Sequence, residues 1–439
     1  MNAREAAYAA LSSYRRNGAW SELALDSVIT KAGLDHREAS LATRICMGVL
    51  QNMMLLDWHI ERVSTIPFSR IQPQIIDILR IGSYQILFTE RIPVHAAVDE
   101  SVKLARRYCG SGASGFVNAL LRRLSSERTE LPVYGDPDPV KELSIRYSHP
   151  EWLVKEYISS YGMQSAEQIL SADNTIPSVS LQVNTLKSDT ASVLESLSEE
   201  GIMAEQHGKM KDCVVLESAG RIAETKAYRA GLIYVQDCAA RASVEAAGPA
   251  DGMTLIDACA APGGKSFAAA VMMGNRGRIL AFDIHEKKLG RIRSGAERLG
   301  ISIIETSVCD ARRFEPVMES AADIVLTDVP CSGTGVIRKK PEIRYKEENR
   351  LASLPDIQLD ILRNQSRYVK PGGALLYSTC TLLRRENEEV ITRFLDSDPG
   401  FQPEDFNTCL GSSDGGMLTL MPSVHGTDGF FICKLRRTQ

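Results

Sequence analysis

The chain has 439 residues, enough for two or three domains of ~100–200 residues each. Hydrophobic residues make up 44% of it and charged residues 24%, a composition that supports a packed core and excludes a mainly disordered chain. The net charge of −4 argues against indiscriminate coating of nucleic acid, but it leaves room for a local basic groove.

The sequence carries no sign of a membrane or secretory protein. Its apolar runs fall short of the ~20 residues that cross a bilayer, and the first twenty residues lack the pattern of a signal peptide. The ten cysteines are scattered singly with no C-x-x-C pair, which is typical of a reducing cytosol, so we expect a cytoplasmic protein with no membrane partner. The seven histidines are equally dispersed, and we expect no metal site.

The first 128 residues carry apolar side chains at three- and four-residue spacing, which is typical of amphipathic helices. The stretches REASLATRICMGVLQNMMLLDWHIERV and RIQPQIIDILRIGSYQILF show this pattern. Such segments are separated by TIPFS, RIP and CGSGASG, which we interpret as helix breakers. The region predicts an all-α bundle, and the proline-rich sequence after it predicts a linker over residues 129–147.

Two further regions follow the linker. Residues 148–239 mix short helices with β-rich pieces such as SVSLQVNT, DCVVLES and GLIYVQD, which predicts a small α+β module. In residues 240–439, helix-period segments alternate with apolar runs such as MTLIDACA, GRILAFD, ISIIETSVCD, ADIVLTDVP and GGALLYSTC. This alternation predicts a parallel, doubly wound α/β sheet of the Rossmann-like kind, which the C-terminal GGMLTLMPSVHGTDGFFICKL closes as a hairpin.

The loop DACAAPGGKSFAAA follows the first strand of the predicted parallel sheet, at the edge where open α/β sheets bind ligands. Gly264-Lys265-Ser266 matches the end of a phosphate-binding P-loop, but Cys259 stands where that motif needs its first glycine, and G-x-G-x-x-G is absent as well. The small residues of the turn leave room for a ligand against backbone N–H groups. We expect cofactor contacts along Cys259, Ala260, Ala261, Pro262, Gly263, Gly264 and Lys265.

Aspartates recur at the ends of the later predicted strands, at Asp283, Asp310 and Asp328. An acidic side chain at the distance of Asp283 from the glycine turn is where a ribose diol is usually held. An adenosyl ligand with one ribose and no pyrophosphate fits this set, so S-adenosylmethionine (SAM) is the expected cofactor. Each aspartate alone could be a helix N-cap, but their recurrence favours ligand binding.

Three motifs occur in order between about Gln236 and Leu435: DACAAPGGK, then DVPCSGTG with IRKKPEIRY, then YSTCTL with ENEEV. In these motifs the chain resembles the RNA cytosine-C5 methyltransferases of the NOL1/NOP2/Sun (Fmu) family. The helical N-terminal region, with FVNALLRRL, resembles the NusB-type RNA-binding domain. The resemblance implies a multidomain protein with a NusB-like bundle (1–128), a linking module (148–239) and a SAM-dependent methyltransferase domain (240–439). It also implies 16S rRNA or a small-subunit assembly intermediate as the partner, and no DNA.

Methylation of cytosine C5 needs a covalent step, because C5 is a poor nucleophile until a thiolate adds to C6. The resemblance implies that Cys380 in STC is this nucleophile and that Cys331 in DVPC assists release of the product. It further implies that Asp328 helps to hold the methyl donor or the base edge, with Lys265 supplying positive charge nearby. Taken singly, a cysteine at a strand end is more often a packing residue, as we expect for the thiols of Cys259, Cys309 and Cys433.

The segment VIRKKPEIRYKEENR supplies a cluster of basic residues that could hold RNA phosphates and so position the RNA without reading its sequence. The predicted RNA contacts are Arg338, Lys339, Lys340 and Arg344. A solvated loop is the alternative, since Glu342, Glu347 and Glu348 dilute the charge.

The sequence leaves other functions to be separated. Glu386-Asn387 matches a motif of DNA cytosine methyltransferases, in which the Pro-Cys thiol, here that of Cys331, would attack. Because STC and APGGK belong to the RNA family, we interpret Glu386 to Val390 as helix surface. The remaining alternatives are a tRNA cytosine-C5 methyltransferase with the same chemistry and a non-catalytic RNA-binding or ribosome assembly factor.

Overall fold

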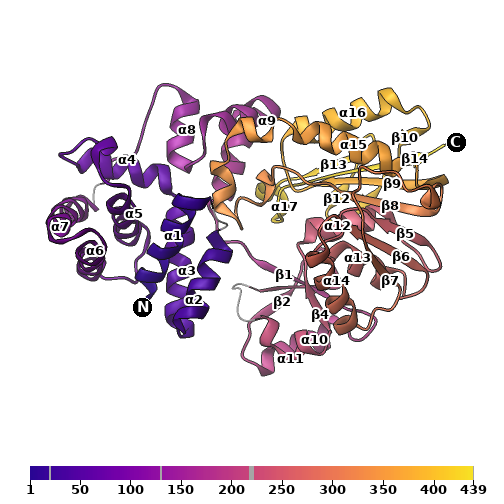
Figure 1. The fold of residues 1–439 in the computed structure, drawn as a ribbon, viewed down its shortest axis with the longest axis horizontal. Coiled ribbons are helices and arrows are strands. Elements are labelled where there is room, and N and C mark those ends of the chain that lie inside the picture. Colours follow the sequence, from indigo (N-terminus) through magenta and orange to yellow (C-terminus); the bar gives the residue numbers. More distant parts are fainter. Residues whose placement is uncertain (19–20, 129–130, 217–221, 439) are drawn as a thin grey trace. The chain divides into compact units, whose positions relative to one another are not determined.

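The computed structural model describes residues 1–18, 21–128, 131–216 and 222–438 (Figure 1). These residues form two compact units. Unit 1 comprises Met1–Thr175 and Ile337–Lys346, and unit 2 comprises Ile176–Val336 and Glu347–Gln439. A short segment from late in the sequence is therefore part of the N-terminal unit. The finer division of the chain at residues 128, 148 and 240 stays a proposal.

Unit 1 is helical, as predicted, and its amphipathic helices share one core that contains the fully buried Ile45, Ile78 and Leu121. Burial of each such side chain contributes roughly 1.5–3 kcal/mol, so the apolar stripe and not helix propensity holds each helix in place. The elements are α1 (Ala3–Asn17), α2 (Ser21–Ala32), α3 (His36–Gln51), α4 (Met53–Val63), η1 (Phe68–Arg70), α5 (Pro73–Phe88), α6 (Val94–Cys109), α7 (Ser111–Ser126), α8 (Pro139–Tyr147), α9 (Glu151–Ala172) and η6 (Pro341–Tyr345).

Three details of unit 1 differ from the sequence prediction. The stretch REASLATRICMGVLQNMMLLDWHIERV forms two helices, α3 and α4, with a 79° bend, because the chain leaves the helical conformation at Asn52 (φ −120°, ψ 18°). α7 begins inside the predicted breaker CGSGASG, because Gly110 alone turns the chain, at φ +92°, where glycine is favoured. α8 lies within the predicted linker and begins after Asp138, whose carboxylate accepts a hydrogen bond from the Val140 N–H.

Within the described residues, no single helix is long and apolar enough to span a membrane. The bent pair α3 and α4 meets that test together, by length and composition only.

Unit 2 begins with a small antiparallel sheet in the order β2-β3-β1-β4. Three of its strands, β1, β3 and β4, fall on the β-rich pieces identified in the sequence, whereas β2 lies outside them. Leu181, Val193 and Ile233 lie in its core. The elements are β1 (Val179–Val183), α10 (Thr190–Glu199), β2 (Ala204–Gln206), β3 (Cys213–Leu216), η3 (Ile222–Glu224), α11 (Lys226–Arg229) and β4 (Ile233–Val235).

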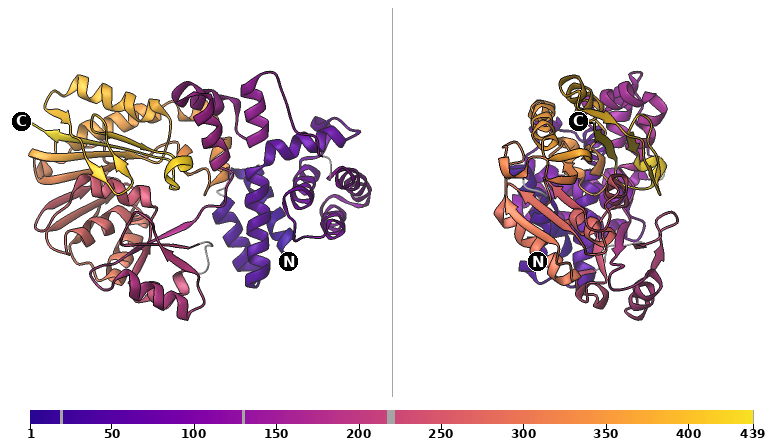
Figure 2. Two further views of the ribbon diagram at one scale, coloured as in Figure 1. Left: turned by 180° about the vertical axis from the view of Figure 1, so that it is seen from behind. Right: turned by 90° about the vertical axis from the view of Figure 1, so that its right-hand side faces the viewer.

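The large sheet of unit 2 has the order β10-β14-β9-β8-β5-β6-β7, with β13 paired to β14. Five of its strands are parallel, whereas β14 runs antiparallel to β9 and to its hairpin partner β13, which confirms the predicted closing hairpin. The strands are β5 (Thr254–Asp257), β6 (Arg278–Asp283), β7 (Ile304–Val308), β8 (Ala322–Asp328), β9 (Val369–Thr379), β10 (Phe401–Pro403), β13 (Met417–Leu420) and β14 (Phe430–Arg437). Between β10 and β13 in the sequence, β11 (Asn407–Thr408) and β12 (Gly411–Ser412) form a separate two-stranded sheet. Figure 2 shows the sheet from behind, with the orange and yellow strands beside the red ones.

Helices cover both faces of the large sheet, as the near-continuous apolar strands require. Successive residues of a strand point to opposite faces, so Leu255 packs in one core and Ile256 in the other. Figure 1 shows α12, α13 and α14 on one face and α15 and α16 on the other. The helices and short helical turns are α12 (Cys238–Ala247), α13 (Gly264–Met272), α14 (Glu286–Leu299), η4 (Pro316–Met318), η5 (Thr334–Val336), η7 (Glu348–Leu351), α15 (Leu354–Ser366), η8 (Arg384–Glu386), α16 (Glu388–Ser397) and α17 (Pro422–His425).

The sheet has one topological switch point. β5 pairs in parallel with both β6 and β8, so the connections that leave the carboxyl end of β5 and of β8 diverge to opposite faces. A crevice opens at such a point in doubly wound sheets, and ligands bind there. The three sequence motifs noted above follow the carboxyl ends of β5, β8 and β9.

Candidate active site

The two motif cysteines meet at the carboxyl edge of β8 and β9. Asp328, the last residue of β8, is in parallel register with Ser378 of β9. Cys331 follows Asp328 by three residues and Cys380 follows Ser378 by two, so the register carries both to the same level beyond the sheet. Their sulfur atoms lie 3.3 Å apart.

The surroundings of Cys331 disfavour its thiolate form. The hydrogen bond shared with Cys380, together with burial and the nearby carboxylates of Glu386 and Asp328, raises the pKa of Cys331 well above that of an ordinary thiol. Cys331 therefore keeps its proton at neutral pH and can donate it in a hydrogen bond to the sulfur of Cys380. A thiolate on Cys380 would receive that bond.

Asp328 lies in an ion pair beside the cysteines. Its Oδ2 is 2.7 Å from the Nζ of Lys265, and its Oδ1 accepts a hydrogen bond of 3.0 Å from the Ser378 hydroxyl. The Lys265 ammonium also lies over the ring of Phe430, 5.1 Å from its centroid. The structure thus joins the cofactor loop, which carries Lys265, to the strand that leads to Cys331.

The cofactor loop turns sharply into α13. Gly263 has φ +111°, and a Cβ at this position would lie 2.7 Å from the ring of Phe267. The turn is braced by hydrogen bonds from the Gly263 N–H to the Ala260 carbonyl and from the Ala260 N–H to the Phe282 carbonyl, both 2.7 Å. The N-cap residue of α13 is Gly263, which has no side chain to cap the helix, so the first N–H groups of the helix can donate to a polar ligand.

Asp257 is a site residue that our sequence prediction omitted. It ends β5, is fully buried, and its Oδ2 accepts a hydrogen bond of 2.6 Å from the Ser266 hydroxyl. Burial raises the pKa of its carboxyl to about 6. The signal was present in the sequence, because Asp257 ends a strand just as Asp283 and Asp328 do.

The other two predicted aspartates lie at the ends of β6 and β7. Asp283 accepts a hydrogen bond of 2.9 Å from the His285 N–H, and α14 has no side-chain cap, so Asp283 is not an N-cap of that helix. Asp310 forms an ion pair with Arg312, and this contact lowers the pKa of its carboxyl. Asp310 lines a cavity of ≈ 340 Å³ together with Ile284, Val308, Cys309, Arg313 and Glu315. These features fit an adenosyl ligand. The helix start offers N–H groups, the glycine at position 263 leaves space beside the loop, and an acidic side chain lies at a cavity.

The cysteines that we expected to be structural lie inside the protein or beside this cavity. Cys433 is fully buried in β14, and burial raises the pKa of its thiol and of the Cys259 thiol. Cys259 therefore remains a neutral thiol within the cofactor loop.

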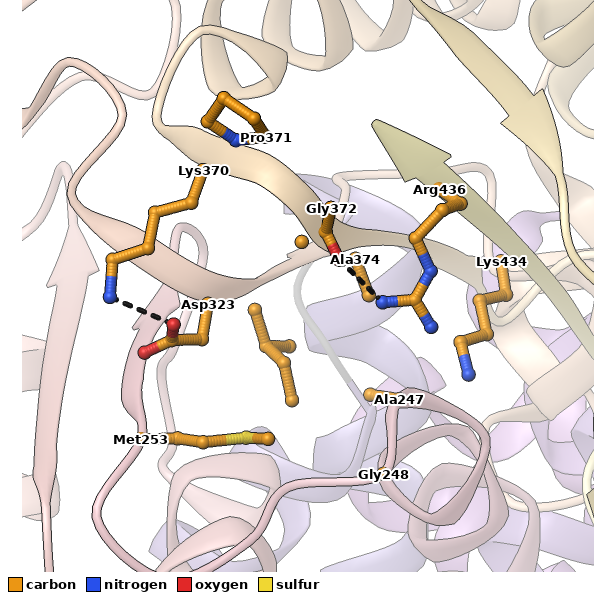
Figure 3. A pocket seen from close by; sticks show the side chains of 12 residues that line it. Ala247, Gly248, Met253, Asp323, Lys370, Pro371, Gly372, Ala374, Lys434 and Arg436 are labelled. Carbon is orange, nitrogen blue, oxygen red and sulfur yellow. Dashed lines mark hydrogen bonds and ion pairs between the residues drawn. The ribbon is translucent and has the colours of Figure 1, made fainter. Parts of the chain in front are cut away.

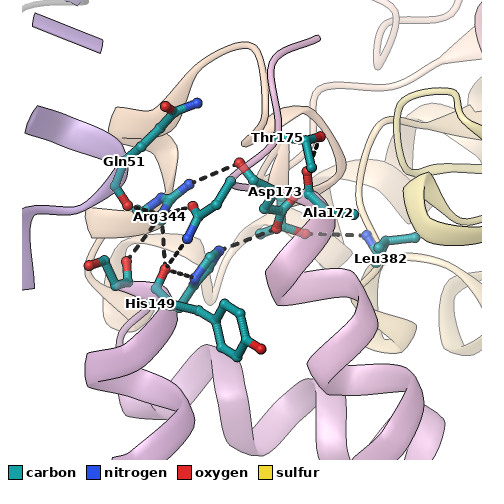
Figure 4. Close-up of polar contacts among 11 residues, drawn as sticks. Gln51, His149, Ala172, Asp173, Thr175, Arg344 and Leu382 are labelled. Carbon is teal, nitrogen blue, oxygen red and sulfur yellow. Dashed lines mark hydrogen bonds and ion pairs between the residues drawn. The ribbon is translucent and has the colours of Figure 1, made fainter. Parts of the chain in front are cut away.

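The RNA-contact prediction is wrong for Arg344. Its side chain is fully buried in unit 1, where the guanidinium donates to the carbonyl of Gln51 at 2.7 Å and to the Asn174 Oδ1 at 2.8 Å (Figure 4). Arg338 is also buried, whereas Lys339 is half-buried and Lys340 is exposed. Of the four predicted RNA contacts, the two lysines are the ones that are not buried.

The interpretation of Glu386 to Val390 as helix surface is also wrong. Glu386, Asn387 and Val390 are each at most 1% exposed, and only Glu389 in this stretch is exposed. Nothing local in the sequence indicates this burial, because it results from packing of η8 and α16 against α15 and the cysteine loops.

A second cavity, of ≈ 260 Å³, lies at the opposite edge of the sheet, where β8 and β9 begin (Figure 3). Its charged side chains are already paired, Lys370 with Asp323 at 2.8 Å and Lys434 with Glu404 at 2.9 Å. Arg436 donates to the Gly372 carbonyl at 2.7 Å. Each cation of the cavity therefore already has a partner, since Arg436 also pairs with Glu404, and the cavity contains none of the motif residues.

Comparisons with known proteins agree with this arrangement. The family model described as 16S rRNA methyltransferase RsmB/F matches residues 245–436, that of the NusB family matches residues 1–126, and that of an RsmF/B-like ferredoxin-like domain matches residues 149–223. The chain is 39% identical to the probable ribosomal RNA small subunit methyltransferase B of Bacillus subtilis, over 99% of this chain and 98% of the relative. It is 32% identical to ribosomal RNA small subunit methyltransferase B of Pseudomonas putida, again over 99% and 98%.

Solved structures show the same fold. The crystal structure of PH0851 is 26% identical and has a TM-score of 0.83, covering 99% of this chain and 98% of that one. A methyltransferase homolog protein from Pyrococcus horikoshii is 27% identical with a TM-score of 0.60, covering 69% and 100%. NSun6 from the same organism, solved with SFG, is 21% identical with a TM-score of 0.60, covers 66% and 98%, and shares the fold.

The sheet order and the carboxyl-edge site are those of a SAM-dependent methyltransferase. With 39% identity over nearly the whole length, the chain belongs to the ribosomal RNA small subunit methyltransferase B family. The predicted fold class, the NusB-like helical region and the SAM cofactor are thereby confirmed, and RNA is the partner.

Proposed function

We propose that the protein methylates C5 of a specific cytosine in 16S rRNA through a transient covalent bond between Cys380 and C6. The observation that carries this proposal is the pair of sulfurs 3.3 Å apart beside the Lys265–Asp328 ion pair. A methyltransferase that modifies an exocyclic nitrogen or a ribose hydroxyl needs no thiol at its active site. Two cysteines at one strand edge fit a reaction that forms and then breaks a bond to sulfur.

Cys380 acts as the nucleophile. Its thiolate adds to C6 of the cytosine, and the electron pair that moves to C5 makes this carbon able to accept the methyl group that SAM would supply, whose bond to the sulfonium sulfur would break and leave its electron pair on that sulfur. The C5 proton then passes to water, its electron pair re-forms the C5–C6 double bond, and the thiolate of Cys380 is expelled. The raised pKa of the Cys331 thiol agrees with this assignment, because a thiol that holds its proton is a poor nucleophile but can still donate a weak hydrogen bond.

Cys331 assists the release step. Its S–H lies next to the sulfur that must depart from C6, and a hydrogen bond to the departing thiolate stabilises the negative charge that develops there. Asp328 is placed to hold the base edge or the methyl donor, since its carboxylate projects from the end of β8 three residues before Cys331.

Residues of the first three parallel strands hold the cofactor. Bound SAM supplies an electrophilic methyl group. The loop from Cys259 to Lys265 gives it backbone N–H groups at the start of α13, Asp283 accepts from its ribose, and Asp310 borders the cavity of ≈ 340 Å³. Lys265 neutralises the carboxylate of Asp328, so that this carboxylate does not repel the phosphate groups of the RNA.

The reacting carbon must enter this pocket, so the target cytosine is unpaired or extruded from its stack. We propose 16S rRNA, naked or within a small-subunit assembly intermediate, as the substrate, with Lys339 and Lys340 as phosphate contacts. Action on rRNA places the protein in the cytoplasm.

Paired substitutions test the assignment. Cys380→Ala removes the nucleophile and should abolish both methyl transfer and any protein–RNA adduct that survives denaturant. Cys331→Ala removes the release donor and should accumulate that adduct. The assay is denaturing gel electrophoresis with radiolabelled 16S rRNA fragments, and Cys109→Ala, which removes a thiol of unit 1, is the control that should match the unmodified protein.

Exchanged phenotypes would contradict the assignment. If Cys331→Ala prevented the adduct and Cys380→Ala trapped it, the Pro-Cys thiol would be the nucleophile, as in the DNA enzymes. Bisulfite sequencing of total RNA from a strain without the gene separates 16S rRNA from tRNA as the substrate.

A further inference from the structure

Buried polar side chains join the two loops that carry Cys331 and Cys380. Each of them is at most 2% exposed, and the proposed reaction gives none of them a role: Ser332, Thr334, Gln358, Thr381, Glu386 and Asn387. We call this set the polar brace. Buried polar groups are costly unless they are hydrogen-bonded, so the bonds that they form show what the brace holds in place.

On one side, the brace holds both neighbours of Cys380. The Oδ1 of Asn387 accepts a hydrogen bond of 2.6 Å from the Thr379 hydroxyl, and its Nδ2 donates one of 3.0 Å to the Thr381 carbonyl. The single side chain of Asn387 therefore fixes the residues before and after the proposed nucleophile.

On the other side, the brace holds both neighbours of Cys331. The Oε2 of Glu386 accepts hydrogen bonds of 2.8 Å from the Ser332 N–H and from the Nε2 of Gln358. The same Nε2 donates to the Pro330 carbonyl at 3.0 Å. Glu386, directly or through Gln358, thus fixes the residues before and after the proposed release thiol.

Hydroxyl groups link the two sides. The Thr381 hydroxyl is 2.7 Å from that of Ser332 and 2.8 Å from that of Thr334. The Gly335 N–H donates to the Cys380 carbonyl at 3.0 Å. The two loops therefore form one hydrogen-bonded body, and the distance between the sulfurs depends on it.

Folding stability does not explain this choice of residues. A buried carboxylate is costly, and apolar residues of similar volume are often as good or better for stability. Within the part of the chain that the structure describes, the Oε1 of Glu386 has no hydrogen-bond partner, which adds to that cost. Such a cost is typical of active sites, where geometry is held at the expense of stability.

We propose that Asn387 and Glu386 are positioning residues, of which Asn387 sets the place of Cys380 and Glu386 sets that of Cys331. The proposal rests on the proposed function for its effect on catalysis, but its effect on the sulfur geometry is independent of it. Displacement of a reacting group by about 1 Å can cost about 100-fold in rate. Loss of either side chain should therefore lower kcat while KM for SAM stays unchanged.

The first experiment measures the sulfur geometry in the full-length protein without RNA or SAM. Diamide takes two electrons and two protons from the two thiols and is reduced to its hydrazine, and one S–S bond forms. Sulfurs held 3.3 Å apart need to move little to reach the ~2.05 Å of a disulfide. Peptide mass spectrometry should find the Cys331–Cys380 disulfide forming rapidly in the unmodified protein and about tenfold or more slowly in Asn387→Ala and Glu386→Ala.

Two matched controls separate position from folding. Asn184 is also fully buried, and its Nδ2 donates to two backbone carbonyls, of Gly231 and Leu299, away from the cysteine loops. Asn184→Ala should lose about as much folding stability as Asn387→Ala, yet it should form the disulfide within about threefold of the normal rate. Glu386→Gln keeps an oxygen that accepts both hydrogen bonds and should restore most of what Glu386→Ala loses.

The second experiment measures catalysis with 16S rRNA. Asn387→Ala should slow adduct formation, and Glu386→Ala should slow adduct decay, each lowering kcat about 10- to 100-fold. If an alanine variant does not fold, Thr379→Val removes only the hydroxyl that donates to Asn387, and Thr327→Val removes an equally buried strand hydroxyl that donates to the Leu376 carbonyl. The first of these should slow the disulfide, and the second should not.

Three outcomes would overturn the inference. The first is a normal rate of disulfide formation in both Asn387→Ala and Glu386→Ala. The second is an equal slowing of disulfide formation in Asn184→Ala and Asn387→Ala. The third is a changed KM for SAM at unchanged kcat. If the brace variants slow the disulfide but no form of the protein methylates cytosine C5, the brace stands and the proposed function fails.

Discussion

Replacement of Arg344 by alanine should strongly destabilise unit 1. The segment Ile337–Lys346 carries this arginine from the C-terminal half of the sequence into the helical unit, where its side chain is fully buried. Its guanidinium donates to the carbonyl of Gln51, at the end of α3, and to the carbonyl of Asp173, after α9. Tyr345 adds a hydrogen bond of 2.7 Å from its hydroxyl to the Leu50 carbonyl.

The size of the effect follows from the acceptors that lose their donor. Alanine removes the hydrogen bonds of 2.7 Å to Gln51, 2.8 Å to the Asn174 side chain and 3.3 Å to Asp173. The Tyr147 carbonyl keeps other donors, the His149 ring and the Asn174 amide. A buried acceptor without a partner costs ~1–3 kcal/mol, so the loss of the donor to three acceptors should cost at least about 3 kcal/mol. For a unit of this size that corresponds to a fall in melting temperature of about 10 °C.

The chain provides a selective probe for this measurement. Of its three tryptophans, Trp58 and Trp152 belong to unit 1, and Trp20 precedes both in the sequence. Tryptophan fluorescence during urea unfolding of the full-length protein therefore follows unit 1 and not the methyltransferase sheet. Arg122→Ala is the matched control, because that arginine is exposed on α7 and bonds only to Asn118 one turn away among the described residues; it should change the free energy of unfolding by less than ~0.5 kcal/mol.

The loss of unfolding free energy in Arg344→Lys should lie between those of Arg344→Ala and Arg122→Ala. A lysine keeps the charge but cannot spread its donors as a planar guanidinium does. A loss below ~1 kcal/mol in Arg344→Ala, or a loss equal to that of Arg122→Ala, would refute the reasoning. It would mean that the carbonyls find other donors and that the segment does not depend on this side chain.

Two further predictions concern the cofactor site. Gly263→Ala places a methyl group against the Phe267 ring at a backbone φ of +111°, so calorimetry should find SAM binding weakened at least tenfold. The control is Gly415→Ala, which has a positive φ but open space around it and should bind SAM normally. Asp257 has a folded-state pKa raised to about 6 by burial, above the ~3.9 of an unfolded chain, so its contribution to stability is complete below pH ~4 and is lost as the pH rises to ~6. Urea titrations followed by circular dichroism should compare the unmodified protein with Asp257→Asn. The difference in their free energies of unfolding should fall by about 2–3 kcal/mol between pH 4 and pH 7. A difference independent of pH would contradict the buried, protonated carboxyl.

The sequence by itself determined the elements and the chemistry that they carry. Strand and helix periods are local properties of neighbouring residues, so β5 to β9 and the buried face of α14 (Leu289, Ile292, Ala296 and Leu299) were predictable from the order of residues alone. The carboxyl ends of parallel strands lie at one edge, so the order of motifs in the chain was enough to place Asp283, Asp328 and Cys380 there together.

Tertiary structure decided which side chains are inside and how far apart the reacting atoms lie. Charge and hydropathy assigned Arg344 and Glu386 to the surface, but both are buried by segments far away in the sequence, from α3 and α9 for Arg344 and from α15 for Glu386. The 3.3 Å between the sulfurs depends on the register of β8 with β9 and on the Asn387 and Glu386 hydrogen bonds. Apart from the hydrogen bonds of Asn387, these contacts join residues 28 to 293 positions apart, and no local pattern encodes them because their free energy is gained only when the whole fold forms.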